Sequence, residues 1–517
     1  MEPGAALPLS AARNSAVDRT SAHEEGDMKL GIIGGGGAAV ALLAALTCDR
    51  LPDLDVTVFE PAKNVGPGRA YLPDSDIALL NVSAERMSVL SDSPGHFLQW
   101  VKERGGLNGG PVSPAAFLPR RLFGEYLAAV AAEITDRLAG RGKSVRTVRS
   151  PVIRLRQGPA GFHALTEDGR RFDGLDRVVL CVGTGGPVDV YRLARSPGYI
   201  NDSYPLSAQL AAVPRKAHVL VLGTGLTAVD TVLFLLENSH RGGITMASRN
   251  GLLPTVRTSA TAPELRHLSH AAVRAALAAD PVMTGERLLA LLDRELREAG
   301  MDLNRACAEA VPGESVARRL RRQLQQARDG GALWQPVIIE AMHESIELIW
   351  HAMPDAERRR FLTRWHRKFV SLLSPMPQRT AIRLQAASDA GQLRVVRGVR
   401  GIRPGEFPLP AFLASTGAGD IAADIVVNTT RPAAAAIPEA AIPLVEGLVK
   451  TGVARRHPLG GVDVARYTNR VLAADGSENR NLFALGHLTA GTHYYTSSML
   501  IIGRQARIVA DQLLRHC

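Results

Sequence analysis

The sequence predicts an α/β protein built from two β-α-β units, the second nested within the first, together with a large helical insertion. Three observations predict this architecture. An apolar strand over 29–33 runs directly into the glycines 34–37, and a similar strand and glycine turn return over 218–225. The stretch 261–390 instead spaces its apolar residues as helices do. At 517 residues the chain is too long for one compact core, so we expect two or three domains.

The first unit begins at Met28. Its strand over 29–33 is followed by a nearly unbroken run of Ala, Val and Leu over 38–46, which is typical of a helix buried against a sheet. A second strand over 55–59 ends at Glu60. The order of strand, glycines, helix, strand and acidic residue predicts a dinucleotide-binding fold.

The glycine turn of this unit follows the pattern G-x-G-x-x-G/A at Gly34, Gly36 and Ala39, with Gly37 completing the glycine run. Gly34 allows the tight turn, and Gly36 leaves room for a pyrophosphate at the helix N-terminus. Ala39 lets the helix pack closely on the strand. The Glu60 carboxylate is placed to accept hydrogen bonds from ribose hydroxyls. A glycine-rich turn that binds no ligand is the alternative.

The second unit repeats the pattern with Gly223, Gly225, Thr227 and Ala228, and its next strand, over 243–247, ends differently. Ser248 and Arg249 stand where an acidic residue would favour NADH. A hydroxyl and a guanidinium suit the 2′-phosphate of NADPH, whereas a carboxylate would repel it. We therefore expect NADPH, and the alternative is that Arg249 is an ordinary surface arginine.

Strand signals later in the chain complete the two units. The strand over 178–182 ends at Gly183, and the strand over 481–485 runs into Gly486 and His487. Strands over 393–396 and 424–428 continue the second unit, the stretch 431–443 crosses back to the first, and a closing helix is predicted over 500–514.

Composition excludes several classes of protein. The net charge of +11 is spread along the chain and falls largely on helical stretches, so we expect solvated helix faces and no nucleic-acid partner. The sequence contains no run of about 20 apolar residues, which is the length needed to span a membrane. Cys48, Cys181, Cys307 and Cys517 form no CxxC pair, so neither a metal site nor a dithiol centre is expected. The expected location is the cytoplasm.

Several segments give the chain a family resemblance from about residue 28 to its end. They are Gly66-Pro-Gly-Arg-Ala-Tyr71, Leu80–Met87, the pair Phe97 and Trp100, Phe117–Tyr126, Trp334, Ile349-Trp350, Glu357–Leu362 and Gly447-Leu-Val449. With the two glycine motifs, they resemble the bacterial FAD/NAD(P)-binding flavoproteins related to amino-acid N-hydroxylating and other two-dinucleotide-binding flavin monooxygenases. The segments 372–377 and 493–498 depart from the family pattern, so we expect a substrate different from those of the commoner members.

The resemblance implies two Rossmann-like dinucleotide-binding domains, one for FAD and one for NADPH, with residues 66–71 and 81–87 along the flavin ring. The further cofactor-binding residues that it implies are Gly68, Arg69, Ala70, Tyr71, Asn81, Met87, Gly183, Gly486 and His487. The expected organisation is a disordered leader over 1–27, an FAD-binding part over 28–210, an NAD(P)H-binding part over 211–260, a helical insertion over 261–390, the rest of the NAD(P)H-binding domain over 391–431 and the rest of the FAD-binding domain over 432–517.

The expected activity is that of an NADPH-dependent flavin monooxygenase. Hydride passes to the flavin N5, O2 adds at C4a, and the resulting peroxyflavin oxygenates a small anionic or amino-acid-like substrate. The candidate catalytic residues are His487, His493 and Arg69. Two alternatives stay open: a flavin reductase that does not oxygenate, and a non-catalytic FAD-binding sensor. A structural or solvent-facing role for His487 also stays open, as does assembly into a homo-oligomer.

Overall fold

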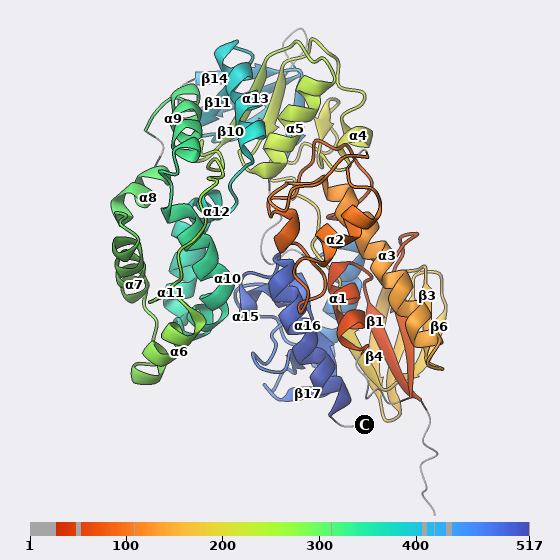
Figure 1. The fold of residues 1–517 in the computed structure, drawn as a ribbon. Helices are drawn as coiled ribbons and strands as arrows, with labels where there is room; N and C mark the ends of the chain where they lie inside the picture. Colours follow the sequence, from red (N-terminus) through yellow and green to blue (C-terminus); the bar gives the residue numbers. More distant parts are fainter. Residues whose placement is uncertain are drawn as a thin grey trace, which may run out of the picture.

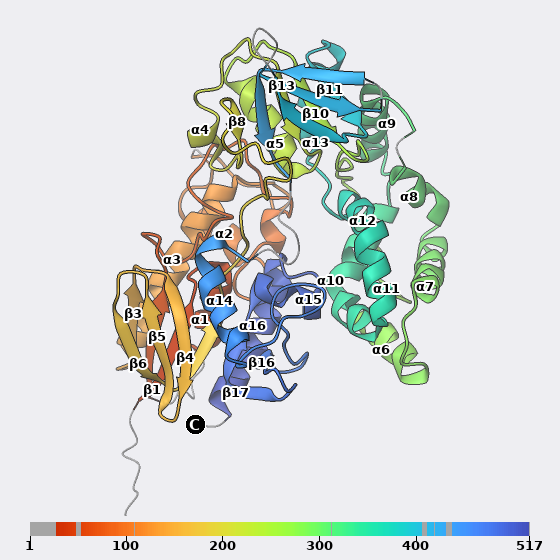
Figure 2. The same cartoon turned by 180° about the vertical axis from the view of Figure 1, so that it is seen from behind.

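The computed structural model describes residues 27–47, 53–107, 109–311, 313–405, 411–417, 419–430 and 437–515. A mostly parallel sheet lies at each end of the molecule, and a group of helices lies beside the two sheets (Figures 1 and 2). The predicted leader lies outside the described residues apart from Asp27, and so does the part of the predicted crossing over 431–436.

The first sheet joins the two ends of the chain. Its order is β16-β17-β7-β1-β2-β3, and each neighbouring pair is parallel except β16 with β17. The strands are β1 (Met28–Ile33), β2 (Leu54–Phe59), β3 (Ser144–Val148), β7 (Arg177–Leu180), β16 (Arg470–Leu472) and β17 (Glu478–Ala484). Leu482 of β17 pairs with Val178 of β7, so the C-terminal segment completes the sheet that the N-terminal segment begins.

Helices cover one face of this sheet, and a small antiparallel sheet covers the other. The apolar helix α1 (Gly37–Ala45) packs against both α3 (Arg120–Ala139) and α16 (Met499–Leu514). The opposite face packs against β4 (Val152–Gly158), β5 (Gly161–Thr166), β6 (Arg171–Leu175) and α14 (Ile442–Lys450). Short helical segments complete this part: η1 (Ala84–Arg86), α2 (His96–Glu103), η3 (Glu439–Ala441), η4 (Gly486–Thr489) and α15 (Ala490–His493).

The second sheet is parallel throughout, in the order β11-β10-β9-β15-β8. Its strands are β8 (Tyr199–Ile200), β9 (Val219–Leu222), β10 (Ile244–Ser248), β11 (Leu393–Arg397) and β15 (Ile425–Asn428). A three-stranded antiparallel sheet accompanies it, made of β12 (Gly401–Pro404), β13 (Phe412–Thr416) and β14 (Gly419–Ala423). The helices on this sheet are α4 (Leu206–Gln209), α5 (Leu226–Glu237), α9 (Val316–Arg328) and α13 (Gln378–Asp389).

Three elements of the second domain, one strand and two helices, lie outside the boundaries that the sequence predicts for that domain. Strand β8 precedes residue 211 and yet pairs with β15 of the second sheet. Helices α9 and α13 fall within 261–390, but Leu320 and Leu384 share a buried core with Val232 of α5. Apolar spacing predicts these helices correctly, whereas the partner of each apolar face is a long-range contact that local sequence does not specify.

The remaining helices form a separate bundle around α10 (Trp334–Ala352), with its own core of residues such as Ile346 and Trp350. The other members are α6 (His270–Ala279), α7 (Gly285–Glu298), α8 (Leu303–Glu309), α11 (Asp355–Arg360), the π-helical turn η2 (Phe361–Trp365) and α12 (His366–Leu373). Helix α10 contacts α15 of the first domain. Among the described residues, no helix combines the length and hydropathy that crossing a membrane requires.

Candidate functional site

The first glycine turn has little room on its sheet side and open space on its outer side. Gly34 has φ +100°, and a Cβ there would lie 2.4 Å from the Cys181 carbonyl oxygen. Gly36 precedes α1, and a Cβ on it would meet only the Gly68 Cα, at 3.7 Å. A side chain at Gly34 would therefore disrupt the fold, whereas one at Gly36 would fill the space in front of the helix N-terminus.

The Glu60 carboxylate ends β2 and turns back onto the glycine turn. Its Oε2 accepts a hydrogen bond from the Gly35 N–H at 2.7 Å, and its Oε1 accepts one from Ala62 N–H at 2.9 Å. The carboxylate has further lone pairs that can accept hydrogen bonds from ribose hydroxyls. A Cβ on Gly35 would lie 2.6 Å from the Glu60 Cβ, so Gly35 is a turn residue that the motif spacing did not identify.

The segment from Gly66 to Tyr71 lies over the same turn. Gly66 N–H donates to the Gly35 carbonyl oxygen at 2.7 Å, and the Gly68 Cα approaches Gly36. Arg69 forms an ion pair with Asp202, in the chain that leads to the second domain. The ring of Tyr71 packs edge-on against Phe123, and burial raises its pKa to about 12. Ala70 lies between Arg69 and Tyr71 and is exposed.

The ends of β7 and β17 lie beside this turn, as the pairing of three parallel strands requires. Gly183 has φ +67°, and a Cβ there would meet nothing within 4 Å. Gly486 has φ +78°, and a Cβ there would lie 3.3 Å from the Ala38 Cβ at the start of α1. His487 follows and is half-buried. The open space at Gly36 and Gly183 fits the pyrophosphate of a dinucleotide.

Other predicted residues of the first turn lie in its packed base. A Cβ on Gly37 would lie 3.2 Å from the Met499 Sδ of α16, so this glycine allows the two helices to approach. Ala39 is fully buried, and Met87 lies in the same apolar core. These three residues hold the turn in place from behind.

The second glycine turn is more open than the first. Gly223 has φ +122°, and a Cβ there would lie 2.6 Å from the Thr429 hydroxyl oxygen, whereas a Cβ on Gly225 would meet nothing within 4 Å. Ala228 is buried under the turn. Thr227 hydrogen-bonds the Tyr204 hydroxyl with its side chain.

The carboxyl end of β10 carries both predicted phosphate-binding residues, and the structure adds a third candidate. The Ser248 hydroxyl lies 3.0 Å from the Thr224 hydroxyl and accepts a hydrogen bond from Gly251 N–H at 2.9 Å, so its first role is to shape the turn. Arg249 is exposed. Arg397 pairs with Ser248 at the end of β11 and is also exposed. The ending of β11 in Arg397-Gly398 is the sequence signal that could have identified this residue.

Arg257 lies where the two dinucleotide-binding domains and the helical bundle meet. Its guanidinium donates to the Asn81 carbonyl oxygen at 2.6 Å and lies over the Phe117 ring. Its Nε is shut off from solvent and has no hydrogen-bond partner among the described residues. Burial, and then the neighbouring Arg86, lower its pKa to about 10, while Tyr495 opposes the shift. Sequence reasoning missed Arg257 because its surroundings come from distant parts of the chain.

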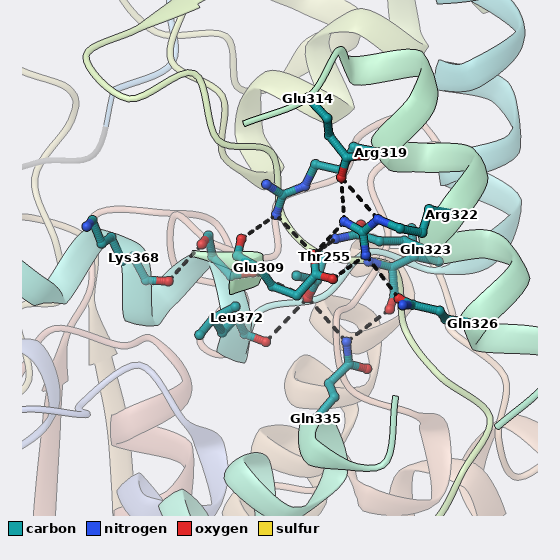
Figure 3. Close-up of polar contacts among 12 residues, drawn as sticks. Thr255, Glu309, Glu314, Arg319, Arg322, Gln323, Gln326, Gln335, Lys368 and Leu372 are labelled. Atoms are coloured by element: carbon teal, nitrogen blue, oxygen red, sulfur yellow. Dashed lines mark hydrogen bonds and ion pairs between the residues drawn. The ribbon is translucent and has the colours of Figure 1, made fainter. Parts of the chain in front are cut away.

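Two buried glutamines hold the loop that carries Arg257 (Figure 3). Gln323 of α9 accepts from Val256 N–H at 3.3 Å, and Gln335 of α10 accepts from Thr258 N–H at 2.9 Å. Gln335 also donates to the Val256 carbonyl oxygen at 2.9 Å. The backbone on both sides of Arg257 is thus fixed by α9 and α10, which directs the guanidinium towards the first domain.

The acid that supports this arrangement is Glu309, at the end of α8 (Figure 3). It accepts hydrogen bonds from Gln323 at 2.6 Å and from Arg322, while its carbonyl oxygen accepts one from Arg319 at 2.7 Å. Burial would raise the pKa of Glu309, but the hydrogen bonds from Arg322 and Gln323 outweigh it and the pKa is lowered. Glu309 therefore remains ionised and fixes the side chain of Gln323.

A second buried group connects the two dinucleotide-binding domains directly. Arg120 of α3 donates to the Tyr204 hydroxyl at 3.1 Å and lies 3.4 Å from the Asp230 carboxylate of α5. Tyr204 in turn donates to Asp230. Burial raises the pKa of Asp230 to about 6, against the opposing effects of Arg120 and Tyr204. These three side chains tie the helix after the second glycine turn to the first domain.

The structure places His493 and Tyr494 against the helical bundle. His493 is almost fully buried, and its ring lies 5.3 Å from that of His351. Burial, then His351 and His457, lower its pKa to about 3. Tyr494 has φ +55°, stacks on Trp350 at 4.6 Å and contacts His366 Nδ1 through its hydroxyl at 2.9 Å.

Comparisons with known proteins agree with this architecture. Residues 31–185 match a family model described as FAD-NAD(P)-binding. The uncharacterized protein YdhS of Escherichia coli K12 is 22% identical over 418 residues, which cover 71% of this chain and 76% of YdhS.

Three solved structures align with nearly the whole chain. The FAD-bound cadaverine monooxygenase of Erwinia amylovora has a TM-score of 0.59 at 12% identity, covering 94% of each chain. L-lysine 6-monooxygenase of Pseudomonas syringae has 0.57 at 17%, covering 94% of this chain and 99% of that one. Ornithine N-hydroxylase of Kutzneria sp. 744 has 0.54 at 17%, covering 95% and 99%.

At these identities the structural likeness establishes the fold. The predicted fold class, two Rossmann-like dinucleotide-binding domains with a helical insertion, is confirmed, and the FAD prediction agrees with the family model. Residues 31–185 therefore form a domain of the FAD-NAD(P)-binding type, and the chain as a whole has the fold of the two-dinucleotide-binding flavin monooxygenases.

Proposed function

We propose that this protein is an FAD-dependent monooxygenase that consumes NADPH and O2 to oxygenate a small anionic substrate. The observation that carries the proposal is the path of the loop after β10. It begins at Ser248, whose hydroxyl lies 3.0 Å from that of Thr224 in the second glycine turn, and it ends with Arg257 on the Asn81 carbonyl oxygen of the first domain. A protein that only stored FAD would not need this second site facing the first.

Each domain has a separate task in this proposal. The backbone around Gly36, Gly68, Gly183 and Gly486 binds the FAD pyrophosphate, and Glu60 binds the ribose. The turn at Gly225 binds NADPH, with the exposed arginines at the ends of β10 and β11 on its 2′-phosphate. FAD, when bound, accepts hydride from NADPH and reacts with O2. The chain binds, orients and keeps water out.

The positive charge around Arg257, where the two domains and the helical bundle meet, supports an anionic substrate. A buried cation without a counter-ion is costly, because its desolvation is not offset by an ion pair. Arg257 is such a cation among the described residues, and Arg86 adds a second positive charge nearby. Arg86 itself is paired with Glu340 of α10, at 2.6 Å. We propose that a substrate carboxylate is held by Arg257.

Two other functions would use the same fold. A flavin reductase would pass the electrons to an acceptor without oxygenation, and a sensor would bind FAD without turnover. The described cysteines do not favour a dithiol reductase, because Cys181 is buried with its pKa raised to about 12 by burial, and Cys307 is a separate free thiol.

The decisive experiment follows the fate of electrons from NADPH. The FAD-loaded protein should be reduced rapidly by NADPH without O2, and on adding O2 with a panel of small carboxylates and amino acids it should yield one oxygenated product by mass spectrometry. Arg257→Met should keep the reduction and lose the product, with the electrons appearing as hydrogen peroxide. Reduction without any product across the panel indicates the reductase, and absence of reduction indicates the sensor.

A further inference from the structure

A cavity lined by polar side chains lies away from both glycine turns, between the helical bundle and the C-terminal part of the first domain. Its volume is about 250 Å³. Its lining includes His351 of α10 and Arg358 of α11, Thr492 of α15, and His457, Asp463 and Arg466 from the chain over 457–472. No residue of either glycine turn contributes to it.

The cavity carries an excess of positive charge. Asp463 is occupied by Arg455, whose guanidinium nitrogens lie 2.7 and 2.6 Å from the carboxylate. Arg358 donates to the backbone carbonyls of Trp350 and His351 at 2.9 and 3.0 Å, and the Asp355 carboxylate, 3.5 Å away, offsets part of its charge. Arg466 is exposed and forms no ion pair with the described carboxylates. An anion entering the cavity would meet the charge of Arg466 without displacing an existing partner.

Hydrogen-bond donors in the cavity are already oriented. Thr492 is more than nine-tenths buried, and its hydroxyl has no partner among the described residues. His457 Nδ1 accepts from Leu459 N–H at 3.0 Å, so the neutral ring carries its proton on Nε2 and can donate from there. An unpaired buried hydroxyl is a cost in the folded protein that a bound acceptor would remove.

Close packing keeps these groups together. Gly491 has no side chain, and a Cβ there would lie 2.2 Å from the His457 Nδ1, so the imidazole rests directly on α15. The carbonyl oxygens of Gly491 and Thr492 contact Trp350 Nε1 at 3.2 Å and His351 Nε2 at 3.1 Å. The chain over 457–472, α10 and α15 thus form one rigid wall.

The imidazoles add no positive charge of their own to the cavity at neutral pH. Burial, and then Arg466 and Arg358, lower the pKa of His351 to about 4, so this ring is neutral at neutral pH. The pKa of His457 is also lowered, by burial first; Asp463 and Asp355 oppose this shift, while Arg358 and Arg455 add to it. Within the described ranges, no three His, Cys, Asp or Glu side chains could hold a metal ion. The arginines therefore make the net charge of the cavity lining positive.

We propose that this cavity binds a small oxyanion, either a carboxylate or a phosphate group, through Arg466, the Thr492 hydroxyl and His457. None of the lining residues is one that we assign to the dinucleotide sites or to the proposed substrate site. Thr492 of α15 lines it, so its occupant contacts the chain that follows Gly486.

Calorimetric titration of the FAD-loaded full chain with inorganic phosphate and with malonate, each against chloride at equal ionic strength, tests the proposal. Saturating NADP+ is present throughout so that the 2′-phosphate site is filled. We expect one saturable site for at least one probe, and the better probe identifies the group. Arg466→Gln should weaken binding by roughly tenfold or more, as loss of a charge-assisted hydrogen bond does.

Two further variants separate a built site from general electrostatics. Thr492→Val removes the unpaired hydroxyl at nearly constant volume, so the variant should fold and yet bind the probe several-fold more weakly. Arg480→Gln removes the same charge from an exposed position on β17 and should leave binding unchanged. Absence of saturable binding for both probes, or equal binding by the parent and the Arg466 and Thr492 variants, would overturn the proposal. Neither result bears on FAD reduction, so the proposed function is tested separately.

Discussion

The two glycine turns share one local pattern but differ in how the rest of the chain encloses them. The first is covered by the segment 66–71, anchored by the Glu60 carboxylate and flanked by the ends of β7 and β17. The second has open space at Gly225 and exposed arginines beside it. This difference supports our proposal that the enclosed turn holds a resident cofactor and the open turn an exchanging cosubstrate.

The largest expected effect comes from equivalent substitutions in the two turns. Gly36→Val should leave a folded protein with little FAD, because the nearest atom to the new Cβ is 3.7 Å away and the side chain occupies the pyrophosphate space. Gly225→Val should retain FAD and lose rapid reduction by NADPH. The flavin-to-protein absorbance ratio and stopped-flow reduction measure the two effects. Equal FAD content in both variants would contradict the comparison.

The next effect concerns the 2′-phosphate. Arg249→Ala and Arg397→Ala should each raise KM for NADPH by about tenfold to hundredfold, since a charge-assisted hydrogen bond contributes roughly 1.5–3 kcal/mol. KM for NADH should change little in either. Arg394→Ala removes a charge from another exposed position on β11, the strand of Arg397, and is the matched control. An unchanged ratio of NADPH to NADH efficiency in both variants would place the phosphate elsewhere.

A smaller effect concerns how the stability of the folded protein depends on pH. His493, at the end of α15, has its pKa lowered to about 3 by burial, so below pH 6.5 the unfolded chain binds a proton that the folded chain does not. Stability should therefore fall as pH decreases from 6.5, by about 2 kcal/mol at pH 5 from this residue. His493→Leu should flatten that slope in thermal unfolding. A slope unchanged from the parent protein would show that His493 does not contribute.

The smallest effect is the response to salt. Interactions of exposed charges are screened within about 10 Å at 0.1 M salt, whereas enclosed contacts are screened less. Raising the ionic strength should therefore weaken NADPH binding several-fold and leave FAD occupancy unchanged. Titration of NADP+ by fluorescence at several salt concentrations, with the flavin content of each sample measured, checks both parts. Parallel loss of FAD would contradict the enclosed character of the first turn.

The local units of this protein can be predicted from short stretches of its sequence. Strand, glycine turn and helix are set by short-range spacing and by positions where only glycine fits, such as Gly34 with its φ of +100°. The two turns, Glu60, and the basic end of β10 with Arg249 were all predicted from that spacing, and the fold class was confirmed. A residue's backbone conformation depends mainly on its near neighbours, so these features are readable in one sequence.

Tertiary structure alone decided which units meet. The sequence did not indicate that Arg257 would be held between Gln323 and Gln335 and face the first domain, or that Arg397 would join Arg249 at one sheet edge. These neighbours are separated by tens to hundreds of residues, and their contacts form only when apolar faces choose partners across the fold. Burial then sets the charges of the groups so enclosed, because desolvation depends on the assembled surroundings rather than on the residue type.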